Sequence, residues 1–282
     1  MGAAVNTLYV SDLDGTLLRP NATLSDYSGR ILLDLLQSGG LFSVASARSV
    51  VSMREILGDV PISLPTVGFN GGTINNWNTG ATLRTACLES DVARHIVEAT
   101  QRVDLSPFVS TDATVDRIRY TELVNAGMHW FLDERKAAGD PRLAHVDSFE
   151  PAYDEDVLCI TVIADMDDLE PLHEGLERTV GGRTQPQLYL SPYGPKWSWL
   201  TFNGPTATKA HGIDTLIALA GLDSDTRVVV FGDAHNDIEM FARADYAIAP
   251  SNAHPDILAA ADEVIGPNTE DAVARWLAAN AI

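Results

Sequence analysis

Two aspartates stand at alternate positions directly after the first short apolar run of the chain. The run is Leu8–Val10, and Asp12 and Asp14 follow it with Leu13 between them. Because side chains at alternate positions of an extended chain point to the same side, both carboxylates can reach one small volume. Gly15 permits the sharp turn that must follow. Such a pair suits a hard cation such as Mg²⁺, and the alternative is a plain Asp-Gly turn.

A second acidic group follows a later apolar run, Arg227–Phe231. It is the segment 232–237, which reads Gly-Asp-Ala-His-Asn-Asp. We expect a helix to begin at Asn236 or Asp237, and helix capping is the alternative explanation for these residues. We interpret His235 as a capping residue or a support for a metal ligand, because no second histidine lies at zinc-site spacing from it.

A serine and a lysine stand at two further element ends. Ser46 follows the apolar run Leu41–Ala45 and, with Arg48 close behind, offers a hydroxyl and backbone N–H groups to an anion. Lys209 is one of only three lysines and lies near the start of a predicted helix, where the helix dipole favours phosphate. A capping serine and a surface lysine are the alternatives.

The elements that carry these residues alternate between strand and helix. Four short apolar runs predict buried parallel strands: Leu8–Val10, Leu41–Ala45, Thr66–Phe69 and Arg227–Phe231. Helical patterns cover Ser25–Gln37 and Ala207–Leu219. The alternation predicts an α/β fold with a Rossmann-like, doubly wound parallel sheet, whose ligand site lies beyond the carboxyl ends of the strands.

The alternation breaks after Phe69 and resumes after Gly204. A hairpin is expected through Thr73–Asn76, and then three helical patterns (90–102, 121–138 and 168–180) mix with short strands at 158–164, 187–190 and 196–202. We expect an α+β domain inserted into the α/β core. The predicted boundaries are 1–82 and 204–282 for the core and 83–203 for the insertion.

The composition excludes several classes of protein. The chain has 282 residues, 45% of them hydrophobic, so it can bury a real core. Its formal net charge of −20 argues against nucleic acid and anionic membrane surfaces as partners. Cys87 and Cys159 are far apart, which favours reduced structural thiols. With no signal-like N-terminus and no bilayer-length apolar run, we expect a cytoplasmic protein. The sequence indicates no oligomeric state.

Taken together, the polar segments resemble the motifs of the haloacid dehalogenase superfamily, and specifically its Cof-type phosphatases. Asp12–Leu17 is similar to the first motif, Ser46 to the second, Lys209 to the third and Gly232–Asp237 to the fourth. The resemblance covers essentially the whole chain, because that subfamily inserts its cap domain between the second and third motifs. It implies that the inserted α+β domain is a cap that sets substrate specificity.

The resemblance also implies a role for each motif residue. Asp12 would be the nucleophile that forms an aspartyl-phosphate, and Asp14 the general acid and base. Mg²⁺ would be bound by the carboxylates of Asp12 and Asp233 and by the backbone carbonyl of Asp14. Asn236 and Asp237 would orient metal-bound waters or the lysine. Contacts with the phosphoryl group or substrate are implied for Gly15, Ser46, Arg48, Asn70 and Lys209, and a plain turn residue is the alternative for Asn70.

The sequence departs from the family pattern at two places. Ala47 stands where the second motif often has glycine, and Ala210 replaces the usual glycine after the lysine. Neither change removes a chemical group, but Ala47 disfavours a positive φ. In the predicted cap, side chains that could contact substrate or could simply be solvated or packed are Arg117, Arg119, His129, Trp130, Arg135 and Lys196.

We therefore expect a Mg²⁺-dependent phosphomonoesterase that acts on a small phosphorylated metabolite, such as a sugar phosphate or a phosphorylated cofactor. A sugar phosphomutase is the alternative among enzymes. Outside the enzymes, the alternatives are a phospho-accepting switch and a phosphate-binding protein.

Overall fold

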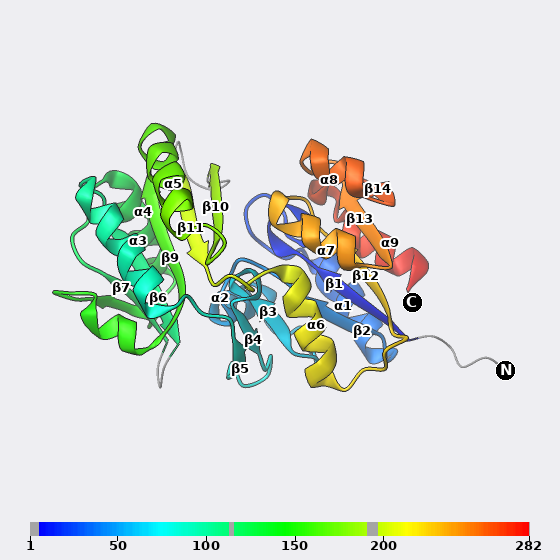
Figure 1. Cartoon of the computed structure of the whole chain (residues 1–282). Helices are drawn as coiled ribbons and strands as arrows, with labels where there is room; N and C mark the ends of the chain where they lie inside the picture. Colours follow the sequence, from blue (N-terminus) through cyan, green and yellow to red (C-terminus); the bar gives the residue numbers. More distant parts are fainter. Residues whose placement is uncertain (1–5, 113–115, 191–196, 282) are drawn as a thin grey trace. The chain divides into compact units, whose positions relative to one another are not determined.

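The computed structural model of the chain describes residues 6–112, 116–190 and 197–281. It divides into two compact units (Figure 1). The core unit comprises Met1–Arg84 and Thr208–Ile282, and the inserted unit comprises Thr85–Ala207. Within the described residues, no helix combines the length and the apolar character that crossing a bilayer requires.

The core unit is built on a parallel sheet of five strands, which confirms the predicted fold class. In spatial order the strands are β14 (Glu263–Ile265), β13 (Tyr246–Pro250), β12 (Arg227–Phe231), β1 (Thr7–Ser11) and β2 (Leu41–Val44). All neighbouring pairs are parallel. Strand β1 therefore lies between β12 and β2, so the segments that follow these three strands meet at one edge of the sheet.

Helices lie between the strands of the core unit and after the last one. They are α1 (Asp26–Gln37), α2 (Val50–Leu57), α6 (Lys209–Ala220), α7 (Ile238–Arg243), α8 (Pro255–Ala260) and α9 (Ala272–Asn280). Helix α1 packs on α9, and α6 packs on α7. The N-cap of α1 is Ser25, whose hydroxyl accepts a hydrogen bond from the Ser28 N–H. Helix α2 was not predicted.

The third predicted strand differs from expectation. Strand β3 (Thr66–Gly68) pairs antiparallel with β4 (Thr73–Asn75) in a small sheet that also holds β5 (Thr82–Thr85). Its link to the parallel sheet is a single-residue parallel bridge between Val67 and Ala45, which directly follows β2. The reason is local: the chain turns at once through η2 (Phe69–Gly71) and folds back on itself.

The inserted unit is an α+β layer structure. Its sheet has the order β10 (Gln185–Leu190), β11 (Ser198–Asn203), β9 (Asp156–Ala164), β6 (Pro107–Asp112), β7 (Arg117–Tyr120) and β8 (Leu143–His145). Along β9, Ile160 and Val162 join a core with α3 (Ser90–Arg102) and α5 (Met166–Val180). Ile163 instead joins the core of α4 (Ala126–Ala137). Alternate side chains of one strand thus bury two opposite faces of the sheet.

One helix boundary in the inserted unit was predicted wrongly. Helix α4 begins five residues after the expected start at Thr121, because the Asn125 side chain caps it by accepting a hydrogen bond from the Met128 N–H. The cysteines agree with the expectation of structural thiols: Cys87 and Cys159 are free, and burial raises the pKa of each thiol to about 11.

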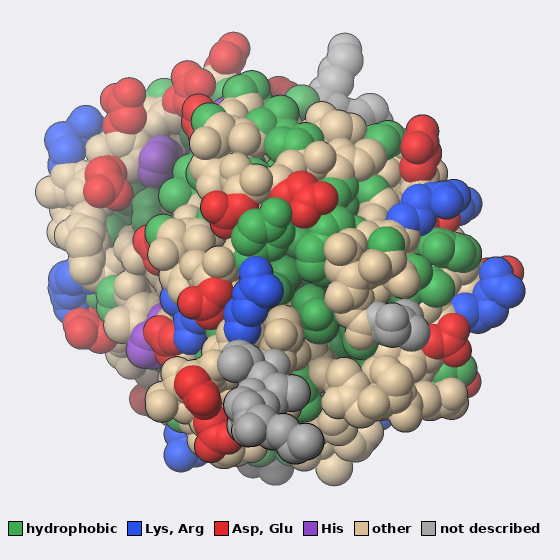
Figure 2. Space-filling model, turned by 90° about the vertical axis from the view of Figure 1, so that its right-hand side faces the viewer, with side chains coloured by type: hydrophobic (Ala, Val, Ile, Leu, Met, Phe, Trp, Pro, Cys, Tyr) green, Lys and Arg blue, Asp and Glu red, His purple; other side chains and the backbone are tan. Residues whose placement is uncertain are grey.

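Acidic side chains are spread over the face drawn in Figure 2, and the basic ones lie singly or in small groups among them. This face carries no broad basic patch, which agrees with the net charge of −20.

Candidate active site

The first two aspartates leave the carboxyl end of β1, as predicted. The N–H of Asp12 donates to the carbonyl of Phe231 at 2.8 Å, so the backbone here is still tied to β12. Asp12 is buried, and the chain then turns through η1 (Leu13–Leu17), in which Asp14 and Gly15 break the helical geometry. Gly15 has φ +80°, a conformation that favours glycine.

Asp233 and Asp237 lie in the loop after β12 and in η4 (His235–Asp237). Asp237 is fully buried, and its Oδ2 accepts hydrogen bonds from the N–H groups of Asp233 at 2.9 Å and Ala234 at 3.0 Å. Thr16, which was not predicted as a site residue, donates a hydrogen bond from its hydroxyl to Oδ1 of Asp233 at 2.6 Å. The position of Thr16 directly after Gly15 was the feature of the sequence that could have identified it as a site residue.

Lys209 links the two acidic segments. It is the first residue of α6, whose N-cap is Thr208, and its side chain is completely buried. The Nζ atom lies 2.7 Å from Oδ1 of Asp12 and 2.6 Å from Oδ1 of Asp237. Burial by itself lowers the pKa of Lys209, but the two carboxylates outweigh it and the pKa is raised. The lysine is therefore a fixed cation inside the site.

The carboxylates of the site are shielded from solvent and repel one another. Burial is the largest cause that raises the pKa of Asp12 well above its ordinary value, against the opposing charge of Lys209. Burial likewise raises the pKa of Asp233 to about 6, against the hydrogen bond from Thr16. When Asp12, Asp233 and Asp237 are all ionised, one lysine leaves a net charge of about −2 at this cluster.

Ser46 and Arg48 reach the same edge from β2. Ser46 is buried, and its hydroxyl accepts a hydrogen bond from the Arg48 N–H at 3.2 Å. The Arg48 guanidinium binds both carboxylate oxygens of Asp14, with Nε to Oδ2 at 2.6 Å and Nη2 to Oδ1 at 2.7 Å. Arg48 was predicted to contact phosphate or substrate, and its ion pair with Asp14 was not predicted. Ala47 does not have a positive φ, so alanine is not strained there.

Two asparagines make further hydrogen bonds at this site. Asn70 lies in η2 with φ +56°, and its side-chain oxygen accepts a hydrogen bond from Asn236 Nδ2 at 3.0 Å. Asn252 was not predicted, yet its Nδ2 donates to the Gly15 carbonyl at 2.8 Å while its Oδ1 accepts from the Asn268 N–H at 2.8 Å. It fixes the turn that holds Asp14.

The Gly15 position yields a testable prediction. A Cβ atom at Gly15 would overlap the Asp233 carboxylate, so Gly15→Ala must displace one of the two acidic segments. We expect Gly15→Ala to lower kcat/KM by about 100-fold, a loss that a misplacement of about 1 Å can cause. Steady-state kinetics on any accepted phosphate ester would measure it.

Gly39→Ala is the matched control for this prediction. Gly39 has φ +88° and nothing within 4 Å of a new Cβ, so it carries the same backbone cost of about 1–2 kcal/mol without the clash. Equal activity losses in the two variants would contradict the explanation.

The motif geometry can be compared with known proteins. The family model for haloacid dehalogenase-like hydrolases matches residues 9–277. The chain belongs to this family. Its relatives include a 5-amino-6-(5-phospho-D-ribitylamino)uracil phosphatase of Bacillus subtilis, which is 22% identical over 96% of each chain. An HMP-PP phosphatase of an Enterobacter species is 27% identical over 94% of this chain and 92% of its own.

Solved structures agree with the family. A haloacid dehalogenase-like hydrolase from Bacteroides thetaiotaomicron has the same fold, with a TM-score of 0.80 and 22% identity over 97% of this chain and 99% of its own. The predicted family resemblance and the predicted enzyme class, a hydrolase of the phosphatase kind, are both confirmed.

The acidic cluster of this hydrolase fits a divalent cation. Ligand oxygens of Asp12, Asp233 and Asp237 lie within 4.8 Å of one another. Asp237 is already bound by Lys209 and two backbone N–H groups, so Asp12 and Asp233 are the better candidates for ligands. Oxygen donors suit Mg²⁺, and a divalent ion would neutralise the excess negative charge.

The candidate specificity residues of the inserted unit lie in different environments. Arg119 is buried and bound to Glu155 at 2.8 Å and to Thr111, so it serves the structure of its own unit. Arg135 lies 3.6 Å from Asp140 and stacks on Phe131. His129 is exposed, Arg117 and Trp130 are partly buried, and Lys196 lies outside the described residues.

Proposed function

We propose that this hydrolase is a Mg²⁺-dependent phosphomonoesterase that works through an aspartyl-phosphate on Asp12. The observation that carries the proposal is the buried Lys209, bound between Asp12 and Asp237 beside Asp233. A phosphate monoester brings two negative charges, and an ammonium group held without water stabilises them more strongly than one in solvent. Mg²⁺ bound by Asp12, Asp233 and the Asp14 carbonyl would supply further charge neutralisation.

Each residue has a role in this proposal. An oxygen of Asp12 attacks phosphorus while the phosphorus–oxygen bond to the leaving alcohol breaks. Asp14 gives a proton to the leaving oxygen and later takes one from the attacking water. For this, the Asp14 carboxyl group must release its hydrogen bonds with Arg48 and turn to the substrate. Ser46 and Lys209 bind the phosphoryl oxygens, with Gly15, Arg48 and Asn70 as further contacts. Asn236 and Asp237 orient Lys209 and the waters around the metal.

We further propose a small phosphorylated metabolite as the substrate. Two relatives are phosphatases of 5-amino-6-(5-phospho-D-ribitylamino)uracil and of HMP-PP, and the first is by its name a small phosphorylated molecule. The net charge of −20 gives no support to a nucleic-acid substrate. We propose that the inserted unit is the cap of this enzyme and determines which metabolite the enzyme accepts.

The first test is phosphate release from a panel of sugar phosphates, nucleotides and phosphorylated cofactors, with Mg²⁺ and with excess chelator. We expect release that requires Mg²⁺ and Asp12. Turnover that requires a bisphosphate activator would identify a phosphomutase instead. No release from any ester would favour a phosphate-binding protein.

The role of Asp14 can be tested with leaving groups of different acidity. We expect Asp14→Asn to lose about 100-fold or more in turnover of an alkyl phosphate, whose leaving oxygen needs a proton. With p-nitrophenyl phosphate, whose leaving group needs none, a rapid burst of nitrophenol should precede slow turnover, because water attack on the aspartyl-phosphate still lacks its base.

Stopped-flow absorbance would measure that burst, with the wild-type enzyme as the reference. If the wild type itself accumulates a stable phosphoenzyme and turns over slowly, the chain is a phospho-accepting switch. Unchanged turnover of alkyl phosphates by Asp14→Asn would contradict the assigned role.

A further inference from the structure

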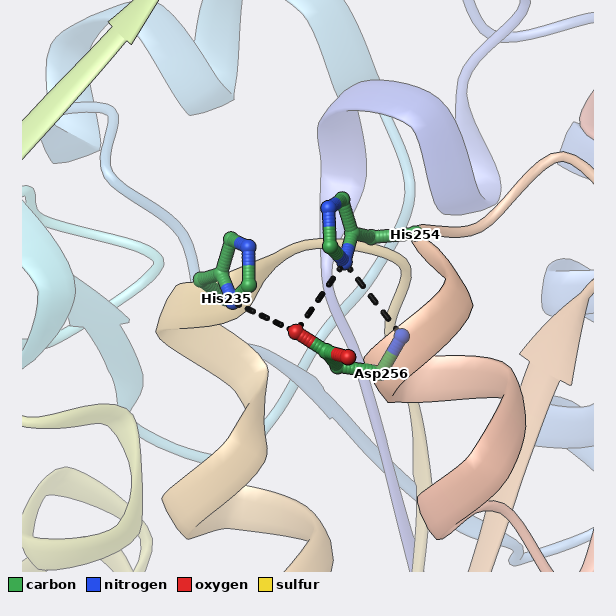
Figure 3. A group of neighbouring side chains, drawn as sticks. All are labelled: His235, His254 and Asp256. Carbon is green, nitrogen blue, oxygen red and sulfur yellow. Dashed lines mark hydrogen bonds and ion pairs between the residues drawn. The ribbon is translucent and has the colours of Figure 1, made fainter.

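A second group of metal-binding side chains lies on the surface of the core unit, apart from the buried carboxylates. Its members are His235 in η4, His254 at the N-cap of α8 and Asp256 in the first turn of α8 (Figure 3). Along the sequence, no second histidine lies at zinc-site spacing from His235. The fold supplies one, because the loops after the adjacent strands β12 and β13 lie side by side and bring the two rings to 4.0 Å between centroids.

The three side chains lie close together, but their His–Asp distances are longer than those of strong hydrogen bonds. One ligand atom from each residue lies within 4.8 Å of the other two. Oδ2 of Asp256 is 3.9 Å from Nδ1 of His235 and 3.5 Å from Nδ1 of His254. Zn²⁺ binds nitrogen and oxygen at about 2.0–2.2 Å, so two ligands of a tetrahedral ion lie about 3.4 Å apart. The Nδ1–Oδ2 distances of 3.9 and 3.5 Å are close to this distance between two ligands.

Direct ion pairing explains the cluster less well. Charge-assisted hydrogen bonds between nitrogen and carboxylate oxygen are about 2.7–2.9 Å long, and both His–Asp distances exceed that range. The side chains are 61%, 45% and 63% exposed for His235, His254 and Asp256 respectively, and ion pairs between exposed groups contribute little. A cation shared by the two neighbouring imidazoles and the carboxylate accounts for this arrangement better.

The backbone that carries the ligands is anchored. The His254 N–H donates to the carbonyl of Asp233 at 2.8 Å, which ties the two loops together. Asp237 holds the beginning of the His235 loop through the N–H groups of Asp233 and Ala234. Only side-chain rotation is therefore needed to complete the site. His254 would give up a long hydrogen bond of 3.3 Å from the Asp256 N–H if it used Nδ1.

We propose that His235, His254 and Asp256 bind a transition-metal ion, Zn²⁺ in particular, at a site separate from the catalytic carboxylates. Two imidazole nitrogens and one carboxylate oxygen suit Zn²⁺, whereas Mg²⁺ prefers oxygen ligands alone. Because His254 is bonded to the carbonyl of Asp233, an ion here would stiffen the loop that holds a catalytic carboxylate. Binding to the folded state alone would stabilise the fold, and the effect would grow with the logarithm of the Zn²⁺ concentration above Kd.

The test is calorimetric titration of the whole protein with Zn²⁺ in excess Mg²⁺, which competes at the carboxylate site. We expect one saturable Zn²⁺ site and a rise in Tm. His235→Gln, His254→Gln and Asp256→Asn should each weaken binding by at least about 10-fold, since even residues that only support ligands change affinity by about that much. His211→Gln, an exposed histidine of the same unit, should bind like the wild type.

Each other outcome overturns the proposal. Binding unchanged in all three ligand variants, or lost in Asp233→Asn, would place Zn²⁺ among the catalytic carboxylates. No saturable binding at millimolar Zn²⁺ would leave the cluster as a surface group of ion pairs. His235→Gln keeps the α8 cap intact, so it separates loss of a ligand from loss of structure. These readouts do not depend on phosphatase activity.

Discussion

Asp12→Asn is expected to lower turnover by several orders of magnitude, because the amide cannot attack phosphorus and form the aspartyl-phosphate. The variant should fold normally. Burial raises the pKa of Asp12, so a neutral side chain at this position relieves a cost that the native carboxylate bears. Lys209 keeps its second partner, Asp237. Phosphate release and thermal unfolding, measured on the same preparation, would check both parts of the prediction.

Two results would contradict this prediction. Near-normal hydrolysis by Asp12→Asn would remove the aspartate from the role of nucleophile and overturn the mechanism. Loss of activity together with loss of the folded state would leave the catalytic role of Asp12 unsupported, because a structural defect would account for both. A variant that is folded and remains inactive when the Mg²⁺ concentration is raised would support the mechanism.

Lys209→Met is expected to abolish activity and to destabilise the core unit as well. Methionine has a similar length, so the change removes the charge and leaves Asp12 and Asp237 buried without their cation. Removing one partner of a buried ion pair costs about 3–5 kcal/mol, which would lower Tm by on the order of 10 °C. Lys136→Met, an exposed lysine on α4, is the control and should change neither property.

The destabilisation by Lys209→Met should depend on pH in a defined direction. Lys209 lowers the pKa of Asp12, so its removal raises that pKa further above its unfolded value. A carboxyl group whose pKa is raised on folding contributes stability at low pH, and the contribution disappears as pH rises through the folded pKa. The variant should therefore lose more stability at pH 8 than at pH 5. A Tm deficit that is equal at both values would contradict the charge explanation.

Local patterns in the sequence were sufficient for much of the fold and for the type of chemistry. The run Arg227–Phe231 is a strand with those bounds, and Ser90–Arg102 is a helix with those bounds. The strand and the helix can both be predicted from residues close together in the sequence. A buried apolar residue recurs at every second position of a strand and at every third or fourth position of a helix. The acidic motifs and Lys209 were visible for the same reason, since each follows a recognisable strand or begins a helix.

Only the tertiary structure decided which of these residues meet. The order β12–β1–β2 places Asp12 beside the loop of Asp233, and α6 delivers Lys209 between Asp12 and Asp237. The ion pair of Asp14 with Arg48 and the cluster of His235, His254 and Asp256 lie across different loops. Contacts between distant segments depend on sheet order and loop direction. Those are properties of the whole packed core that no short stretch of sequence encodes.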